Sequence, residues 1–485
     1  MNTLRQNAIS NACSETQDCL VVGAGINGAV AAASLTGRGA KVTVVDKADF
    51  ASFTSQESSN LAWGGIKYLE SYEFGLVWKL CRCRNQLMKA YPGQVREIRF
   101  FTSITKGFRK PRIVLYLGAL LYWFMGRCQT RPPRLLSRKT IRREAPMVNT
   151  SHLIGGLEYS DCHLVENDTR FAFGFIRKVL KAGGSAINYM ELIAADWRDG
   201  YWHCTLRDHV SGEAVGLQTK TIVNAAGPYA DRVNVLLGIE STFKHIFSKG
   251  AHIIVPQVTK TEHVLTFFAS DGRLFFMVPM GNRTCIGTTD TRVDNAAAQP
   301  TSDDVEFLLA NANALLDLKQ PLTKNDVIAT RCGVRPLVVR KTDEIGNAEW
   351  MALSRKHEID VDAERKMCSV YGGKLTDCLN VGNEITEIIE SFGVALNQTT
   401  RWFGEDSAQD ETDSGEPVIG PIGRRPIQRM AESEMVVQLE DFLRRRTMLE
   451  LTMGREALRT DPGLREAADI LFGEKAGAEL ERYLR

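Results

Sequence analysis

The chain has 485 residues, of which 44% are apolar and 24% are charged. This composition is typical of globular proteins and unlike that of disordered or collagen-like chains. A chain of this length is expected to fold into two or three domains, each with its own core. Its eleven cysteines form no CxxC pair, which disfavours a disulfide framework and predicts that the protein has no metal site. The N-terminus is not typical of a signal peptide, so we expect a reducing cytoplasmic environment.

The net charge of +2 hides a strong local asymmetry. Residues 96–143 contain thirteen Lys and Arg and a single acid, Glu97. Inside this stretch, residues 113–125 carry no charge, and the run is too short to span a bilayer, which needs about 20 residues. The basic residues that flank it are Arg109, Lys110, Arg112, Arg127, Arg131 and Arg134. The run is therefore either a buried core helix or a segment that lies on an anionic membrane surface, and the basic flanks favour the membrane. No motif for nucleic acid accompanies it, so we expect no nucleic-acid partner.

Residues 1–17 are polar and show no helix or strand period, which predicts a disordered tail. An apolar strand then leads into three glycines, Gly23, Gly25 and Gly28, and into a helix of small residues. A second apolar strand, residues 42–45, ends on Asp46. This order is typical of a dinucleotide-binding unit rather than of an ordinary glycine-rich turn.

Each part of this unit has a physical task. Gly23 permits a tight turn, Gly25 lets a pyrophosphate lie against the main chain, and Gly28 lets helix and strand pack closely. The free N–H groups at the helix N-terminus favour phosphate. Asp46 is placed to accept hydrogen bonds from a ribose diol. The residues beside these positions, Ile26, Asn27 and Lys47, are expected to contact the cofactor too.

The middle of the chain has a different pattern from this strand–helix–strand unit. Short strands are predicted at residues 252–255, 264–268, 274–278 and 284–287, with Asp-Gly and Gly-Asn turns between the last three. They indicate an antiparallel sheet. A strand at 221–223 runs into a turn of small residues, 224–228. After an acidic linker, 406–426, helices are predicted at 432–447 and 465–471.

Residues 54–70, TSQESSNLAWGGIKYLE, resemble the segment that follows the nucleotide loop in respiratory, quinone-linked, FAD-dependent glycerol-3-phosphate dehydrogenases. Further matches follow in the same order, and they are EYSDC at 158–162, IGTTD at 286–290, GVRPL at 333–337, GGKLT at 372–376 and LEDFLRRRT at 439–447. The resemblance implies an α/β fold with an α+β insert, like that of D-amino acid oxidase. It has a Rossmann-like FAD domain, an antiparallel substrate-binding sheet and a short C-terminal helical domain.

The expected domains are discontinuous. Residues 18–75, 150–240 and 330–398 would form the FAD-binding domain, and residues 399–485 the helical domain. Residues 76–149 and 241–329 would form a substrate or cap domain that carries the basic, membrane-facing segment.

The resemblance also implies which residues bind FAD. Ser58, Ser59, Gly64 and Gly65 would line the pyrophosphate and isoalloxazine, and Ala226 and Gly227 the adenosine half. Gly373, Leu375 and Thr376 would begin a late helix whose N-terminus faces the flavin, where negative charge develops on reduction.

For the substrate, the resemblance implies that Arg335, Arg355 and Lys374 hold an anion, with Lys67 and Tyr68 nearby. Three positions depart from the family: Trp63 replaces its His, Lys67 its Arg and Asn60 its Lys. Indole cannot accept a proton as imidazole can. Either another group accepts it, with His357 or a water as candidates, or the substrate differs.

The predicted function is oxidation of sn-glycerol 3-phosphate to dihydroxyacetone phosphate at the cytoplasmic face of the inner membrane, with electrons passed to quinone. The chain has no second glycine-rich nucleotide motif, which argues against NAD as the acceptor. The expected partners are this anionic substrate, quinone, an anionic membrane surface and a second copy in a homodimer. Two alternatives remain open: a flavin enzyme for another hydroxy or amino acid, and a catalytically lapsed flavoprotein at the membrane.

Overall fold

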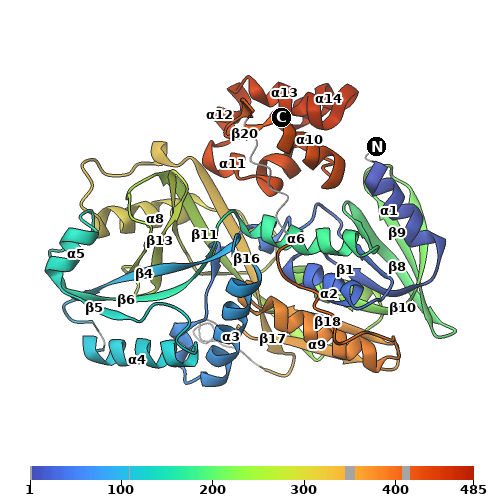
Figure 1. The fold of residues 1–485 in the computed structure, drawn as a ribbon, viewed down its shortest axis with the longest axis horizontal. Helices are drawn as coiled ribbons and strands as arrows, with labels where there is room; N and C mark the ends of the chain where they lie inside the picture. The colour runs from blue at the N-terminus through green and yellow to red at the C-terminus, as the bar shows by residue number, and fades with distance from the viewer. Residues whose placement is uncertain (1–2, 109, 344–354, 407–414) are drawn as a thin grey trace.

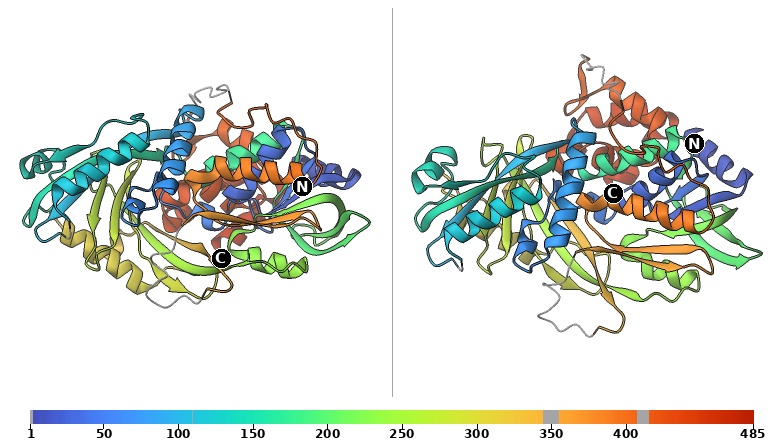
Figure 2. Two further views of the ribbon diagram at one scale, coloured as in Figure 1. Left: turned by 90° about the horizontal axis from the view of Figure 1, so that it is seen from below. Right: turned by 60° about the horizontal axis from the view of Figure 1, so that its bottom comes forward.

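The computed structural model describes residues 3–108, 110–343, 355–406 and 415–485. Two sheets lie side by side, and a C-terminal helical domain sits across one edge of the molecule (Figure 1). The N-terminal helix packs at the far end of the first sheet, away from the second (Figures 1 and 2).

The first sheet has the order β17-β18-β10-β1-β2-β7, with β8 and β9 extending from β10 as antiparallel neighbours. Its strands are β1 (Gln17–Val22), β2 (Val42–Val45), β7 (Ser185–Ile187), β8 (Met190–Arg198), β9 (Tyr201–Asp208), β10 (Ala214–Asn224), β17 (His357–Asp362) and β18 (Met367–Gly372). The central pairs from β18 to β7 are parallel. Strands in such a sheet are covered on both faces, so they read as continuous apolar runs.

Helix α2 (Ile26–Gly37) packs between α6 (Asp168–Lys181) and α9 (Cys378–Ser391) on this sheet. Its residues from Gly28 to Thr36 are all buried. A short helix, α7 (Ala230–Leu236), follows the turn after β10. The predicted strand–glycine–helix–strand unit is therefore confirmed as β1, α2 and β2.

The second sheet has the order β15-β11-β14-β13-β12-β4-β6-β3, with β16 beside β11 and β5 beside β6. Its strands are β3 (Leu61–Ala62), β4 (Val95–Thr105), β5 (Arg134–Leu136), β6 (Leu153–Leu164), β11 (Phe243–Pro256), β12 (Val264–Phe268), β13 (Leu274–Met280), β14 (Arg283–Gly287), β15 (Thr291–Val293) and β16 (Ala329–Arg340). Around it lie α3 (Phe74–Ala90), α4 (Arg112–Met125), α5 (Arg138–Glu144) and α8 (Ser302–Leu315).

The four strands predicted here are confirmed, but the sheet is larger and more mixed than expected. Strands β12 and β4 pair in parallel. Strands β6 and β16, which the sequence analysis assigned to the FAD-binding domain, belong to this sheet. They belong to it because they pair with its strands along most of their length. Strand β16 pairs with β11 from Ala329 to Arg340, and β6 pairs with β4, both in antiparallel orientation.

The prediction of a disordered N-terminal tail is wrong. Residues Thr3–Ser14 form helix α1, which packs against β7 and β10. Arg5 is buried and forms an ion pair of 2.7 Å with Asp208. It also donates to the carbonyl oxygen of Asn188. A short polar helix gains most of its stability from tertiary contacts of this kind, which local sequence does not show.

The C-terminal domain is helical as predicted, with different boundaries. It contains β19 (Pro417–Ile419), β20 (Ile422–Gly423), α10 (Arg424–Ser433), a π-helical turn Asp441–Arg446, α11 (Leu449–Thr452), α12 (Arg455–Thr460), α13 (Gly463–Phe472) and α14 (Ala476–Leu484). The helix predicted at 465–471 is confirmed as α13. The prediction of one helix over residues 432–447 is wrong, because α10 ends at Ser433 and a separate turn begins at Asp441. The Asp441 carboxylate accepts the N–H groups of Val437 and Gln438 and so caps this new turn. Part of the predicted linker, residues 407–414, lies outside the described residues.

The uncharged run forms α4, which lies along the outside of the molecule beside α3 (Figures 1 and 2). Ala119 and Tyr122 are its buried residues. Its apolar side chains Ile113, Val114, Leu117, Leu121 and Phe124 are 44–63% exposed. The interpretation as a buried core helix is therefore wrong. None of the helices in the described part of the chain is long and apolar enough to cross a bilayer.

Candidate functional site

The glycine loop between β1 and α2 forms one wall of a cavity of about 490 Å³. Gly23 has φ +97°, and a Cβ there would lie 2.6 Å from the carbonyl oxygen of Ala225. A Cβ on Gly28 would lie 1.8 Å from the carbonyl oxygen of Gly23. Gly28 therefore acts through helix–strand packing, while Gly23, Gly25, Ile26 and Asn27 line the cavity.

Asp46 and Lys47 line the cavity where β2 ends. The Asp46 carboxylate accepts the N–H groups of Ala24 at 2.7 Å and Ala48 at 3.0 Å. Its burial raises its pKa to about 6. Any ribose contact must share this carboxylate with two main-chain donors. The Lys47 Nζ lies 3.4 Å from the ring centroid of Tyr229.

The loop after β2 forms a second wall, with Ser58 and Ser59 on the cavity. The Ser55 Oγ accepts the N–H of Ile26 at 2.9 Å, which ties this loop to the glycine loop. The turn after β10 adds Ala226 and Gly227 to the lining.

The third wall is the segment after β18, where Gly373, Leu375 and Thr376 line the cavity. The Asn27 Nδ2 donates to the carbonyl oxygen of Gly372 at 3.0 Å. Glycine loop and late segment thus meet although they are far apart in the sequence.

Gly64 and Gly65 follow Trp63, which lines the cavity, but neither glycine is among the residues that line it. The Gly64 N–H donates to Asp161 at 3.0 Å. A Cβ on Gly64 would lie 2.2 Å from the Tyr122 Oη. Gly65 has φ +82°. Both glycines permit the tight passage of the main chain that brings Trp63 to the cavity.

Three predicted cationic residues converge on the cavity: Arg335, Arg355 and Lys374. The Arg335 Nη1 lies 3.2 Å from Asp290 Oδ1, and the Arg355 Nη2 lies 3.5 Å from Asp290 Oδ2. Burial and the neighbouring Arg355 lower the pKa of Arg335 to about 10. Gly250 is necessary for this arrangement, because a Cβ there would lie 2.1 Å from the Arg335 Nη2.

The Lys374 side chain is held between two aromatic rings. Its Nζ lies 4.1 Å from the ring centroid of Tyr68 and 5.1 Å from that of Trp63. Burial and the nearby Arg355 hold the pKa of Lys374 well below its ordinary value.

Lys67 and Tyr68 line a second cavity of about 310 Å³. Trp63, Phe276, Thr288, Arg335 and Arg355 border both cavities, so the two adjoin. Arg273 and Asp290, which the sequence analysis did not single out, also line the second cavity.

His357 is in a different environment from the one predicted. Its Nδ1 lies 2.6 Å from Asp377 and its Nε2 lies 2.7 Å from Glu384. Although burial opposes the charge, hydrogen bonds to the two carboxylates raise its pKa to about 9. A ring with both nitrogens engaged cannot accept a substrate proton, so the structure contradicts His357 as proton acceptor.

His252 is the functional candidate that sequence reasoning missed. It is buried, lines the larger cavity, and its Nε2 lies 3.0 Å from the Ser59 Oγ. Its Nδ1 has no hydrogen-bond partner among the described residues. Burial, together with Arg331 and Arg335, holds its pKa well below the ordinary value. A histidine within the apolar strand β11 was the available signal, but such a residue is usually part of the core.

Comparison with known proteins agrees with this geometry. The model of the DAO family, FAD dependent oxidoreductase, matches residues 18–366. The chain belongs to this family of FAD-dependent oxidoreductases. The aerobic glycerol-3-phosphate dehydrogenase of Escherichia coli is 31% identical over 369 residues, which are 75% of this chain and 71% of that protein. The D-erythritol 1-phosphate dehydrogenase of Brucella abortus is 30% identical over 367 residues, again 75% and 71%.

A solved glycerol-3-phosphate dehydrogenase from Bacillus halodurans, complexed with FAD, has the same fold. Its TM-score is 0.76 at 20% identity, with 99% of this chain and 96% of that chain covered. The predicted family, the D-amino acid oxidase-like fold, and FAD as cofactor are thus confirmed. The close main-chain approaches at Gly23 and a cavity lining that includes the glycine loop, Asp46 and the segment after β18 fit a dinucleotide.

The His357 ion cluster predicts a pH-dependent loss of stability. Its folded pKa of about 9 exceeds the ordinary value of about 6.5. The protonated ring therefore adds stability that is complete below pH 6.5 and is lost as pH rises through 9. We expect His357→Gln to lower the free energy of unfolding by about 3 kcal/mol at pH 6. Urea denaturation at several pH values should show this difference shrinking towards pH 10. An unchanged difference would mean that the ring is neutral, and exposed His209→Gln is the control.

Proposed function

We propose that this protein oxidises the secondary alcohol of a small polyol phosphate to a ketone, with sn-glycerol 3-phosphate as its substrate. The observation that carries the proposal is the convergence of Arg335, Arg355 and Lys374 on the FAD cavity, next to the late segment. Planar guanidinium groups suit a phosphate dianion, and Lys adds a compact point charge. FAD bound in this cavity would supply the acceptor for a hydride from the substrate carbon.

The positions of the cavity residues support the cofactor roles that we propose for them. The glycine loop with Ile26 and Asn27 would hold the pyrophosphate, and Asp46 and Lys47 the ribose. Ala226 and Gly227 would lie at the adenosine half. Ser58, Ser59, Gly373, Leu375 and Thr376 would lie nearer the flavin.

The hydroxyl proton requires an acceptor, and we assign it to His252. The ring is neutral near pH 7 because burial and the two arginines disfavour its charged form. Its Nδ1 is buried and has no hydrogen-bond partner within the described structure, so the proton would reach the ring at Nε2, which lies 3.0 Å from the Oγ of Ser59, a residue that lines the cavity. A phosphate dianion held by Arg335 would offset the arginine field and so raise the basicity of the ring when substrate binds.

A longer polyol phosphate is a second candidate substrate. The adjoining cavity of about 310 Å³ offers further volume and cationic groups, Lys67 and Arg273, beyond Arg335 and Arg355. The erythritol phosphate dehydrogenase among the relatives acts on a substrate of this kind, as its name states.

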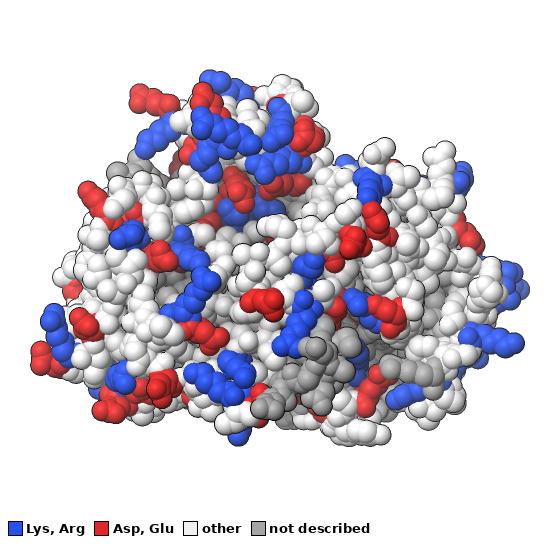
Figure 3. All heavy atoms as spheres, turned by 180° about the vertical axis from the view of Figure 1, so that it is seen from behind, with Lys and Arg blue, Asp and Glu red and all other residues white. Residues whose placement is uncertain are grey.

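We further propose that the exposed face of α4 rests on an anionic membrane, where quinone accepts the electrons. Exposed Tyr72, Phe74 and Trp78 extend the apolar surface from the neighbouring segment that begins α3. Arg112 is the first residue of the helix, and Lys110 and Arg127 flank it, whereas Arg109 lies outside the described residues. The face in Figure 3 contrasts with this local excess of basic residues, because its positive and negative side chains are interspersed.

The first test measures dye-coupled turnover with glycerol 3-phosphate, erythritol phosphate, glycerol, hydroxy acids and amino acids. Turnover restricted to non-phosphorylated compounds would contradict the proposal.

Removing a charge that holds a buried anion costs about 2–5 kcal/mol, so Arg335→Ala should lower kcat/KM roughly 30- to several-thousand-fold. FAD content should not change, and Arg335→Lys should restore only part of the rate. Loss of FAD together with activity would make Arg335 a structural residue.

His252→Asn should lower kcat about 10²- to 10⁴-fold, the usual contribution of general base catalysis. Because kcat/KM reports the pKa of the free enzyme, the wild type should keep full kcat/KM at pH 6.5 and lose it only at clearly lower pH, where the ring becomes protonated. In the variant this acid limb should disappear while FAD stays bound. If the limb persists unchanged in the variant, the acceptor is another group.

The membrane proposal predicts salt-sensitive binding to vesicles. Replacing Lys110, Arg112 and Arg127 by Gln should weaken binding to anionic vesicles by about 1 kcal/mol per charge. Leu117→Ser with Phe124→Ser should weaken binding to neutral and anionic vesicles alike. Arg465→Gln with Arg485→Gln, both in the C-terminal domain, is the matched control. Unchanged vesicle sedimentation in both test variants would exclude α4 as the contact.

A further inference from the structure

Three consecutive arginines in the π-helical turn of the C-terminal domain are almost fully buried. The exposed fractions of the Arg444, Arg445 and Arg446 side chains are 6%, 4% and 1%. Arginine is rarely buried unless a partner neutralises it. The partners of these three therefore show what the turn is positioned to hold.

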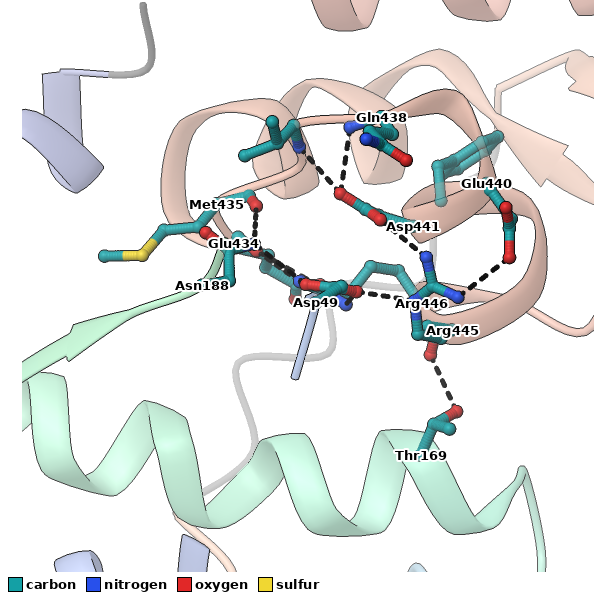
Figure 4. Close-up of polar contacts among 12 residues, drawn as sticks. Asp49, Thr169, Asn188, Glu434, Met435, Gln438, Glu440, Asp441, Arg445 and Arg446 are labelled. Atoms are coloured by element: carbon teal, nitrogen blue, oxygen red, sulfur yellow. Dashed lines mark hydrogen bonds and ion pairs between the residues drawn. The ribbon is translucent and has the colours of Figure 1, made fainter. Parts of the chain in front are cut away.

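The first partner is Asp49, in the loop that follows β2. The Arg446 Nη1 and Nη2 lie 2.7 and 3.0 Å from its two carboxylate oxygens, a bidentate pair (Figure 4). The Arg445 Nε donates to the same carboxylate at 2.7 Å. Asn188 adds a fourth hydrogen bond to Asp49 at 2.8 Å. Asp441 and Glu434, from the C-terminal domain itself, neutralise the remaining charge of the two arginines (Figure 4).

The second anchor lies further along the same loop. The Arg444 Nη2 donates to the carbonyl oxygen of Gln56 and to the Glu57 carboxylate, at 2.5 and 3.0 Å. Arg331, from β16, donates to the same Gln56 carbonyl oxygen and pairs with Asp168 at 2.7 Å. Asp168 in turn accepts the Ser58 N–H at 2.8 Å.

The opposite side of this loop is the FAD cavity. Ala51, Ser52, Phe53, Thr54, Ser55 and Glu57 lie between or at the two anchors and line the cavity. The Ala51 N–H donates to the carbonyl oxygen of Ala24, in the glycine loop, at 3.0 Å. The arginines therefore hold from behind a wall whose front contacts the dinucleotide.

We propose that Arg444, Arg445 and Arg446 are positioning residues for FAD, so that docking of the C-terminal domain and binding of the cofactor are thermodynamically coupled. The residues act through Asp49, Gln56 and Glu57, and do so whichever substrate the enzyme oxidises. Released from these anchors, the loop samples more conformations, and FAD must then restrict it on binding. The coupling is reciprocal, so FAD must also strengthen the contact between the loop and the C-terminal domain.

The test uses the full chain and two independent measurements. FAD is titrated into apoprotein of the wild type, Arg446→Lys, Arg446→Gln and Arg424→Gln, with flavin fluorescence as the readout. Arg424 is the matched control, because it lies in the same domain and pairs with Glu466 at the surface. Hydrogen exchange of residues 441–446 is measured in the wild type with and without FAD.

A coupling of ordinary size changes affinity about 5- to 150-fold. We expect Arg446→Gln to raise the Kd for FAD within this range, and Arg446→Lys to raise it less, since Lys keeps the charge but loses the bidentate geometry. Arg424→Gln should leave it within twofold. FAD should slow exchange of residues 441–446 in the wild type.

A purely structural role predicts a different result. Arg446→Gln would then lower the thermal stability of the apoprotein while its Kd for FAD stays within twofold of the wild type, which would overturn the proposal. If Arg446→Gln does not fold, the exchange measurement decides, because equal exchange of residues 441–446 with and without FAD excludes the coupling.

Discussion

The loop from Asp46 to Asn60 is the constraint on which the site depends, because it joins the two sheets. It leaves the first sheet at the end of β2 and enters the second at β3. A loop of this length is ordinarily mobile, and this one must present a continuous wall to a dinucleotide. The loop is held by buried, desolvated ion pairs. Such pairs tolerate few alternative geometries, because leaving one buried charge unpaired costs several kcal/mol. The fold therefore adds buried ion pairs to the apolar packing of Phe50, a loop residue that belongs to the core.

In the adjoining cavity, one carboxylate organises two guanidinium groups. Asp290 contacts both Arg335 and Arg355, and Ser248 donates to it as well. With Lys374 beside them, the local balance stays positive. The arrangement is preorganised for an anion, because its hydrogen-bond donors are already oriented before an anion binds. Gly250 and Gly333 leave space on neighbouring strands, at paired positions of β11 and β16.

Local patterns predicted the parts of the fold that local physics determines. The glycine spacing, the apolar strands β1 and β2 and the short strands of β11 to β14 each follow from steric or hydrophobic rules that act within a few residues. Helix α1 and the break before Asp441 could not be predicted in this way. The first depends on Arg5 reaching Asp208, 203 residues away, and the second on a side-chain cap that competes with the helix. The site shows the same division, since the cavity-lining glycines were visible in the sequence while His252 is defined only by what surrounds it.

The replacement of the family histidine by Trp63 is understandable once these neighbours are known. The Trp63 carbonyl oxygen accepts a hydrogen bond from Thr376 at 3.0 Å, so its main chain still joins the late segment. Its indole faces Lys374, and an aromatic face favours an ammonium over a neutral amine. Burial and Arg355 act in the opposite direction on the same pKa. The tryptophan thus supports the charge of Lys374, a task a histidine could not perform once protonated. Under the proposed function, proton acceptance then falls to His252, which lies on β11 of the second sheet and shares the cavity with Trp63.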